Sequence, residues 1–266
     1  MRDRNDLRDV IGAAIAEVAQ GVVRPLFRNL QADDIQVKGV VQGVEDYVTA
    51  ADLACEAALA QRLATLLPGV PLVGEEGIHR GTAALPGPTG RCFICDPIDG
   101  TRHFRAGNER YSIMLVLVED GQPTHAWIHA PERGLMADAA LGAGARINGE
   151  RIRLDNRPLA AGDGIAAFGE FRGERLKARL ERLVPGIVQV NGYGVGMDVM
   201  DVLLGRGRGV VQTCAKIWDI LPGQFIMSEA GLFTGRLDAD PCPVSAAQWT
   251  YALPSRTDVE RLLGAP

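Results

Sequence analysis

Residues 96–101 read Asp-Pro-Ile-Asp-Gly-Thr and directly follow the apolar run Phe93-Ile94-Cys95. The run predicts a buried strand that ends at Asp96. A carboxylate at the end of a buried strand costs free energy unless it is paired, hydrogen-bonded or bound to a metal. Two carboxylates in one short segment, Asp96 and Asp99, therefore predict a cation at this place in the fold.

The rest of the segment suits a divalent metal and a phosphate. Pro97 stiffens the exit of the strand, so both carboxylates can turn toward one point while the Ile98 carbonyl stays free as a further oxygen ligand. Hard oxygen ligands of this kind suit Mg²⁺ or Mn²⁺. Gly100 permits close approach of the backbone, and the amides of Gly100 and Thr101 could open a helix that receives a phosphate oxygen. Taken alone, the segment is also compatible with a plain turn.

Two further acidic clusters stand at similar boundaries. Glu75 and Glu76 follow the short apolar run 71–73 and Gly74, and Asp219 follows Trp218 at the start of a predicted helix. Each cluster alone has a simple structural explanation, because glutamate pairs are commonly solvated and an aspartate at a helix start is commonly an N-cap. Their joint occurrence in this order favours one shared acidic site.

Composition narrows the class of partner. The 266 residues carry 33 Asp and Glu against 28 Lys and Arg, a net charge of −5, without a basic stripe. Phosphate backbones require clustered Lys and Arg, so this balance argues against nucleic acid and for small ligands or metals. No apolar run approaches the roughly 20 residues of a membrane-spanning helix, and the charged start lacks a signal-peptide core. We therefore expect a cytoplasmic protein with no membrane partner.

The five cysteines are sparse and odd in number, which fits reduced thiols better than disulfides. Cys92 and Cys95 have the spacing of a redox or zinc pair. Residues three apart in a strand face opposite sides, however, so we expect two buried thiols.

Hydrophobic periodicity predicts two regions with different secondary structure. Residues 5–27 read as an amphipathic helix, and a second helix follows Thr49, a plausible N-cap, and ends before Pro68. Between 70 and 154, short apolar runs separated by turns predict a mostly antiparallel sheet, with a hairpin at Asn148-Gly149. Residues 79–89, rich in Gly and Pro, are the best candidate for a mobile loop.

From about residue 160, strand and helix signals alternate, which predicts an α/β half with partly parallel strands. The expected strands are 164–168, 187–190 and 209–213, and the expected helices are 173–183, 197–204 and 219–230. We expect two intimately packed halves, residues 1–157 with the first two acidic clusters and residues 158–266 with the third, forming one catalytic unit.

Together the motifs resemble the inositol monophosphatase family, within the wider group of metal-dependent, typically lithium-sensitive sugar phosphatases. Order and spacing match through nearly the whole chain. The matching segments are Val48-Thr49-Ala50-Ala51-Asp52, Gly74-Glu75-Glu76, Asp96-Pro97-Ile98-Asp99-Gly100-Thr101, and Trp218-Asp219 followed by Gly223. The resemblance implies an α/β (α+β layered) fold with alternating α/β/α/β/α layers, usually as a homodimer. It also implies hydrolysis of a small phosphate monoester, such as inositol monophosphate, by metal-activated water.

The resemblance also implies roles for individual residues. Glu75, Asp96 and the Ile98 carbonyl would hold one Mg²⁺, Asp96, Asp99 and Asp219 would hold a second, and Glu75 would support a third, weaker ion. Asp52 and Thr101 would orient and deprotonate the attacking water, with Glu75 beside them. Gly100, Thr101, Gly194, Val195 and Gln212 are the expected contacts to phosphate and substrate.

The substrate stays open at this point. Inositol-specific relatives carry Glu where this chain has Gln212, and Arg102 points weakly to histidinol-phosphate phosphatases of the same family. Fructose 1,6-bisphosphate and adenosine 3′,5′-bisphosphate are further candidates.

Two other classes of protein share features with this sequence. The run 192–196, Gly-Tyr-Gly-Val-Gly, mimics a dinucleotide fingerprint, but Met197 stands where a third small residue is needed. A non-catalytic protein that binds metal and phosphate as a regulator is the alternative from a different class.

Overall fold

The computed structural model describes residues 4–41, 44–85, 89–169, 180–181, 183–184, 188–191, 194–237 and 248–264. Its larger sheet has seven strands in the order β3-β4-β5-β6-β7-β8-β9, antiparallel except for the β3–β4 pair. The strands are β3 Leu72–Gly74, β4 Arg91–Asp99, β5 Ser112–Glu119, β6 Gln122–Ala130, β7 Leu135–Ala140, β8 Gly144–Ile147 and β9 Glu150–Ile152. This confirms the expected mostly antiparallel sheet. The hairpin also forms as predicted, with Asn148 and Gly149 at φ 49° and 82° between β8 and β9.

The smaller sheet has five strands in the order β11-β10-β12-β14-β13. Strand β10 is parallel to both β11 and β12, and β14 is antiparallel to both β12 and β13, as expected for an α/β half. The bounds are β10 Gly164–Gly169, β11 Val188–Asn191, β12 Gly209–Ala215, β13 Phe233–Leu237 and β14 Gln248–Leu253. Most of the expected helix 173–183, and Gly192 and Tyr193 of the fingerprint-like run, lie outside the described residues.

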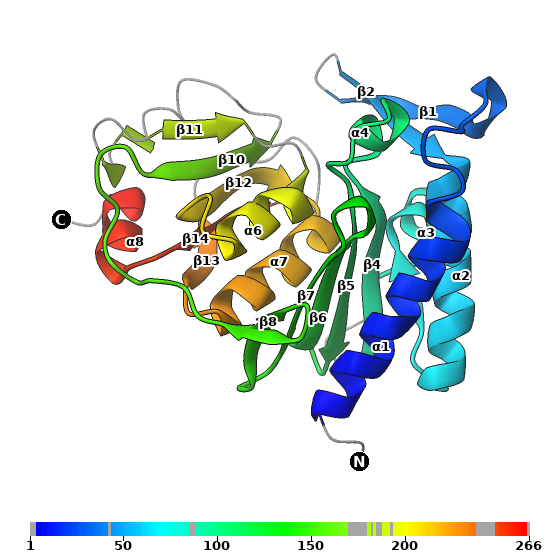
Figure 1. Ribbon diagram of the computed structural model, residues 1–266, viewed down its shortest axis with the longest axis horizontal. Helices are drawn as coiled ribbons and strands as arrows, with labels where there is room; N and C mark the ends of the chain where they lie inside the picture. Colours follow the sequence, from blue (N-terminus) through cyan, green and yellow to red (C-terminus); the bar gives the residue numbers. More distant parts are fainter. Residues whose placement is uncertain are drawn as a thin grey trace.

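Helices and sheets alternate in layers (Figure 1). Helices α1 (Arg4–Val18) and α2 (Ala50–Leu66) cover one face of the larger sheet, and α6 (Val195–Leu203) and α7 (Ile217–Glu229) lie between the two sheets. Helix α8 (Arg256–Leu263) packs on the far face of the smaller sheet. The α/β/α/β/α layering predicted from the sequence is therefore confirmed.

Strand β4 divides two hydrophobic cores. Cys92 and Ile94 face α6 and α7, whereas Phe93 and Cys95 face α1 and α2. Cys92 and Cys95 are buried free thiols on opposite sides of the strand, as the spacing predicted.

Two features differ from the sequence-based expectations. The expected helix 5–27 ends at Val18, and a π-helical turn, Ala19–Val23, follows it. The extra residue of that turn keeps Ala19 and Val23 buried before Pro25, which has no backbone N–H to continue a helix. The sequence analysis also missed a two-stranded sheet, β1 (Ile35–Val41) with β2 (Val44–Thr49), which carries the exposed Val37 and Val40.

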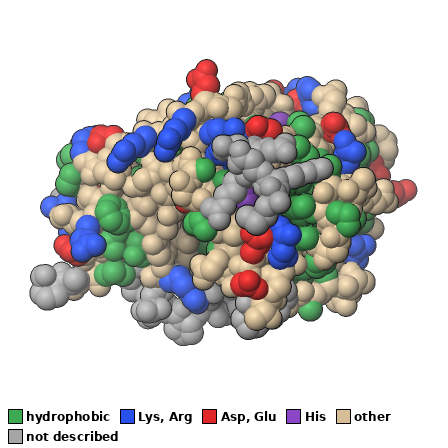
Figure 2. Space-filling view, turned by 90° about the horizontal axis from the view of Figure 1, so that it is seen from below, with side chains coloured by type: hydrophobic (Ala, Val, Ile, Leu, Met, Phe, Trp, Pro, Cys, Tyr) green, Lys and Arg blue, Asp and Glu red, His purple; other side chains and the backbone are tan. Residues whose placement is uncertain are grey.

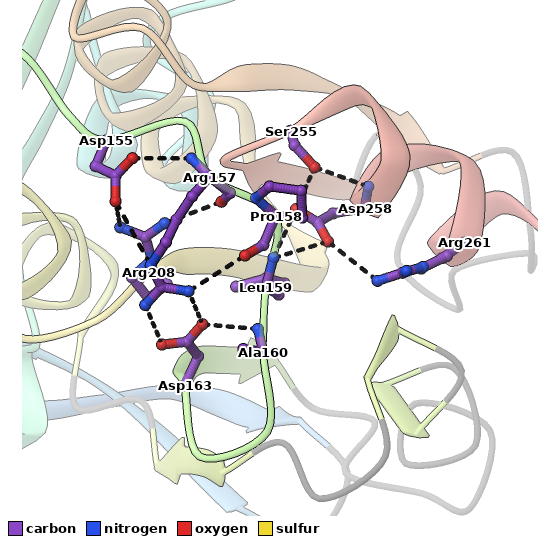
Figure 3. A network of polar contacts seen from close by, with 10 residues as sticks. All are labelled: Asp155, Arg157, Pro158, Leu159, Ala160, Asp163, Arg208, Ser255, Asp258 and Arg261. Carbon is purple, nitrogen blue, oxygen red and sulfur yellow. Dashed lines mark hydrogen bonds and ion pairs between the residues drawn. The ribbon is translucent and has the colours of Figure 1, made fainter.

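The connection between β9 of the larger sheet and β10 of the smaller sheet crosses the surface as an extended segment, residues 153–163 (Figure 3). Arg157 forms an ion pair with Asp163, and Arg208 donates to Asp155. Further along, the Leu159 N–H donates to the buried carboxylate of Asp258 in the first turn of α8. These contacts fix the crossover to both β12 and α8.

No helix in the described parts of the chain is long and apolar enough to cross a bilayer. Figure 2 shows Lys and Arg side chains interspersed with Asp and Glu side chains on the lower face of the molecule.

Candidate functional site

Three carboxylates meet where β4 ends and α7 begins. Asp96 and Asp99 lie at the end of β4, and Asp219 lies in the first turn of α7; one carboxylate oxygen of each lies within 4.8 Å of the others. Local bonds hold two of them: Asp96 Oδ1 accepts from the Ile98 N–H at 3.0 Å, and Asp219 Oδ2 accepts from the Lys216 N–H at 2.9 Å.

The carboxylates of this cluster repel one another. Burial raises the pKa of Asp96 and of Asp219 well above the ordinary value, and the neighbouring carboxylates, Glu75 first among them, raise both further. Burial also raises the pKa of Asp99, to about 6. A set of hard oxygen donors that repel each other in a buried place fits a divalent cation such as Mg²⁺ or Mn²⁺.

Asp99 is held from outside its own strand. Its Oδ1 accepts from the Val195 N–H at 3.0 Å, and its Oδ2 accepts from the Gly196 N–H at 2.8 Å. The Ser112 hydroxyl lies 3.2 Å from the same Oδ2. Asp99 of the first half is thus bonded to the first turn of α6 in the second half.

A second pair lies beside the cluster. The Thr101 hydroxyl, at the start of α4 (Thr101–Arg105), lies 3.2 Å from Asp52 Oδ1 and 3.0 Å from the Ile98 carbonyl oxygen. Asp52 Oδ2 accepts from the Thr49 N–H at 2.8 Å and from the Thr49 hydroxyl at 2.5 Å, so Thr49 is the N-cap of α2, as predicted. Burial raises the pKa of Asp52 to about 7.

The glutamates after β3 bind a lysine that the sequence analysis did not connect to the site. Lys38 Nζ lies 2.6 Å from Glu75 Oε1 and 2.7 Å from Glu76 Oε1, and only 4% of its side chain is exposed. Lys38 comes from β1, whose sheet was not predicted. The two glutamates share this one ammonium group, which offsets part of their negative charge.

Glu56 is a second residue that the sequence analysis missed. Its carboxylate accepts from the N–H groups of Glu76 and Gly77, both at 2.9 Å, and so fixes the first turn of α3 (Glu75–His79). A Cβ at Gly74 would lie 2.0 Å from Glu56 Oε2, which explains why the acidic pair is preceded by glycine. The signal in the sequence is only that Glu56 follows Asp52 by one helical turn.

The expected substrate contacts are distributed as follows. Gly100, at φ 85°, begins α4, and a Cβ there would lie 2.9 Å from the Arg110 carbonyl oxygen. A Cβ at Gly194 would lie 2.9 Å from Asp99 Oδ2, while the Val195 N–H is already bonded to Asp99. Gln212 is buried in β12, where its Oε1 accepts from the Thr250 hydroxyl at 3.0 Å.

The raised carboxyl pKa values predict an unusual pH dependence of stability in the metal-free protein. A carboxyl whose pKa is higher in the folded chain than in the unfolded chain binds more protons when folded, so the free energy of unfolding falls as pH rises. The window runs from the unfolded value near 4 to the folded values, about 6 for Asp99 and about 7 for Asp52. In EDTA, we expect Tm by calorimetry to be several degrees lower at pH 8 than at pH 5.5.

Mg²⁺ added at pH 8 should restore that Tm, because it binds the ionised carboxylates of the folded chain. A metal-free Tm that rises from pH 5.5 to pH 8 would contradict the expected charge repulsion.

Comparison with known proteins gives a consistent result. The model of the family described as "Inositol monophosphatase family" matches residues 6–263. "Fructose-1,6-bisphosphatase/inositol-1-monophosphatase" of Thermotoga maritima is 31% identical over 208 residues, covering 76% of this chain and 74% of the relative. "Nus factor SuhB" of Xylella fastidiosa is 29% identical over 191 residues, covering 70% of this chain and 67% of the relative.

A solved structure, an "IMPase/NADP phosphatase complexed with Mg2+ and phosphate", has the same fold. It superposes with a TM-score of 0.79 at 21% identity, over 98% of this chain and 95% of the other.

Proposed function

Because the chain belongs to the inositol monophosphatase family, we propose that it is a Mg²⁺-dependent phosphatase that hydrolyses a small phosphate monoester. The observation that carries the proposal is the convergence of Asp96, Asp99 and Asp219 beside the Asp52–Thr101 pair. The cluster supplies hard ligands for metal, and the pair supplies a hydroxyl next to a carboxylate that can accept a proton.

Two groups of oxygen ligands are available for Mg²⁺. Asp96, Asp99 and Asp219 would hold one ion, and Glu75, Asp96 and the Ile98 carbonyl would hold another. When bound, such ions lower the pKa of a coordinated water and stabilise the charge that develops on the phosphate. In the second group, Lys38 contacts Glu75 Oε1, so a metal would bind Glu75 beside this ammonium group or in place of it.

The chain's own residues would handle the proton. Thr49 occupies Asp52 Oδ2 with two hydrogen bonds, which leaves Oδ1 to the Thr101 hydroxyl. As water attacks phosphorus, Thr101 Oγ1 accepts a proton from the water and passes its own proton to Asp52 Oδ1. The water oxygen forms the new P–O bond while the P–O bond to the leaving group breaks, and the leaving oxygen takes a proton from solvent to become the alcohol, so no phosphoenzyme is needed.

Contacts to the phosphate would come from the backbone. The amides of Gly100 and Thr101 stand at the start of α4, directly after the metal-binding carboxylates, where N–H groups lack partners within the helix. Gly194 brings the backbone of the second half against Asp99 and Gly100. Val195 would bind substrate only indirectly, through Asp99, because its N–H is engaged there.

Gln212 would help to choose the alcohol. It is buried in β12, and its Oε1 accepts from the Thr250 hydroxyl. Its amide can donate a hydrogen bond, which the ionised glutamate of inositol-specific relatives cannot do. This polarity favours an alcohol that carries an acceptor group, as in histidinol phosphate or a second phosphate, over one recognised through hydroxyl donors.

The experiment is phosphate release with and without Mg²⁺, across inositol monophosphate, histidinol phosphate, fructose 1,6-bisphosphate and adenosine 3′,5′-bisphosphate. We expect release from at least one compound, abolished by EDTA and restored by Mg²⁺ or Mn²⁺. Metal binding without release from any of these compounds would instead support the second candidate, a non-catalytic regulator. The relationship to a protein named Nus factor SuhB is the observation that favours that alternative.

We further propose that the protein acts in the cytoplasm as a homodimer.

A further inference from the structure

We propose that Ser112 is a positioning residue for the metal-binding carboxylate of Asp99. Its buried hydroxyl, together with the first turn of α6, fixes the orientation of that carboxylate and thereby sets the affinity of the site for divalent metal. The inference rests on the proposed metal site.

The position of Ser112 in the sheet places its hydroxyl beside Asp99. Ser112 is the first residue of β5 and lies directly opposite Asp99 in the β4–β5 ladder. It is 0% exposed, and its hydroxyl lies 3.2 Å from Asp99 Oδ2. The residues that follow in β5, 113–118, are all apolar and buried. A buried hydroxyl in such a strand needs a partner, and Asp99 supplies it.

The first turn of α6 packs closely against both Ser112 and Asp99. A Cβ added at Gly196 would lie 2.1 Å from Ser112 Oγ, so α6 reaches this place only because residue 196 is glycine. The close approach lets the N–H groups of Val195 and Gly196 bind one oxygen of Asp99 each. Ser112 therefore lies between the strand end and the helix start, in contact with both.

The three donors together restrict the carboxylate. Both oxygens of Asp99 are bonded by groups from β5 and α6, so the carboxylate cannot turn about its last side-chain torsion without breaking a bond. Oδ2 accepts two of the three bonds and Oδ1 accepts one, so Oδ1 keeps a further lone pair for a metal. Groups that orient a metal ligand in this way typically change metal affinity by about 10–100-fold when removed.

Ser112→Ala removes the hydroxyl and leaves α6 and the sheet in place. The matched control is Thr124→Val in β6, which removes another buried sheet hydroxyl, one that lies 3.4 Å from the Leu117 carbonyl oxygen. Binding is measured directly as loss of the free Mn²⁺ signal in electron paramagnetic resonance, on the metal-free full chain at pH 8. The Mg²⁺ concentration for half-maximal phosphate release is measured beside it.

We expect Ser112→Ala to raise the Kd for Mn²⁺ by about tenfold and to raise the half-saturating Mg²⁺ concentration by a similar factor. At saturating Mg²⁺, kcat should stay close to that of the parent chain, because Ser112 does not touch substrate. Thr124→Val should leave Mn²⁺ binding unchanged.

An unchanged Kd in Ser112→Ala, or an equal rise in Thr124→Val, would overturn the inference. Because Mn²⁺ binding needs no substrate, this result is separate from the proposed activity. A chain that binds Mn²⁺ in a Ser112-dependent way but releases no phosphate would contradict the phosphatase proposal and leave the role of Ser112 intact.

Discussion

Asp96→Asn should lower kcat/KM for phosphate release by at least about 10³-fold. Asp96 is the carboxylate that both proposed metal groups share, so its loss weakens each of them. In the parent chain, the Ile98 N–H donates to Asp96 Oδ1. The asparagine amide keeps an oxygen that can accept this hydrogen bond. It also removes one charge from a cluster of buried carboxylates that repel each other. The variant should therefore fold, with a metal-free Tm at pH 8 equal to or above that of the parent chain.

Asp138→Asn is the matched control. Asp138 is also a buried carboxylate of the first half, but it is paired with Arg146 at 2.8 Å. Removing its charge leaves Arg146 with Asp9 as its ion-pair partner and takes a carboxylate charge away from the buried Arg8, so we expect a lower Tm with normal Mg²⁺-dependent release from the folded fraction. Metal-dependent release that survives in Asp96→Asn would contradict the assignment of the site.

Thr101→Val should lower kcat by about 10²–10⁴-fold, the range typical for loss of a proton-transfer group. Valine has nearly the shape of threonine but no hydroxyl, so Asp52 Oδ1 loses its contact to the attacking water. The three metal-binding carboxylates are untouched, and Mn²⁺ binding by electron paramagnetic resonance should stay within about threefold of the parent value. Release measured at saturating Mg²⁺ isolates the effect on the chemical step.

Thr101→Ser is the conservative partner of that variant, because it keeps the hydroxyl between Asp52 and the Ile98 carbonyl oxygen. We expect most of the activity to return. A Thr101→Val enzyme with normal kcat would show that water is activated without this pair and would remove Asp52 from the proposed mechanism.

Some of the site was predictable because its signals are local. Asp96 and Asp99 follow an apolar run, so a buried strand with charges at its end can be recognised from a few neighbouring residues. Thr49 precedes Asp52 by three residues, which is the spacing of a helix start. The hydrophobic periodicities of the chain predicted an antiparallel sheet followed by an α/β region, whereas the order of the layers was implied by the family resemblance.

The other contributors come from contacts between segments far apart in sequence. Lys38 reaches Glu75 from a short sheet in which Val37 and Val40 are exposed, so burial does not impose a clear hydrophobic alternation on β1. Ser112 is one hydroxyl in a run that otherwise reads as core. The role of Ser112 depends on the register of β4 and β5 and on the close approach of Gly196, and neighbouring residues in the sequence predict neither of these. The π-helical end of α1 depends likewise on what Ala19 and Val23 pack against.

The bond between Asp99 and the start of α6 also constrains how such a gene can recombine. A crossover within the surface connection 153–163 would pass Asp96 and Asp99 from one parent and Val195, Gly196 and Asp219 from the other. The exposed connection would tolerate the change of parent sequence. The chimera would nevertheless combine Asp99 from one parent with the first turn of α6 from the other. The two halves should therefore descend together as one unit.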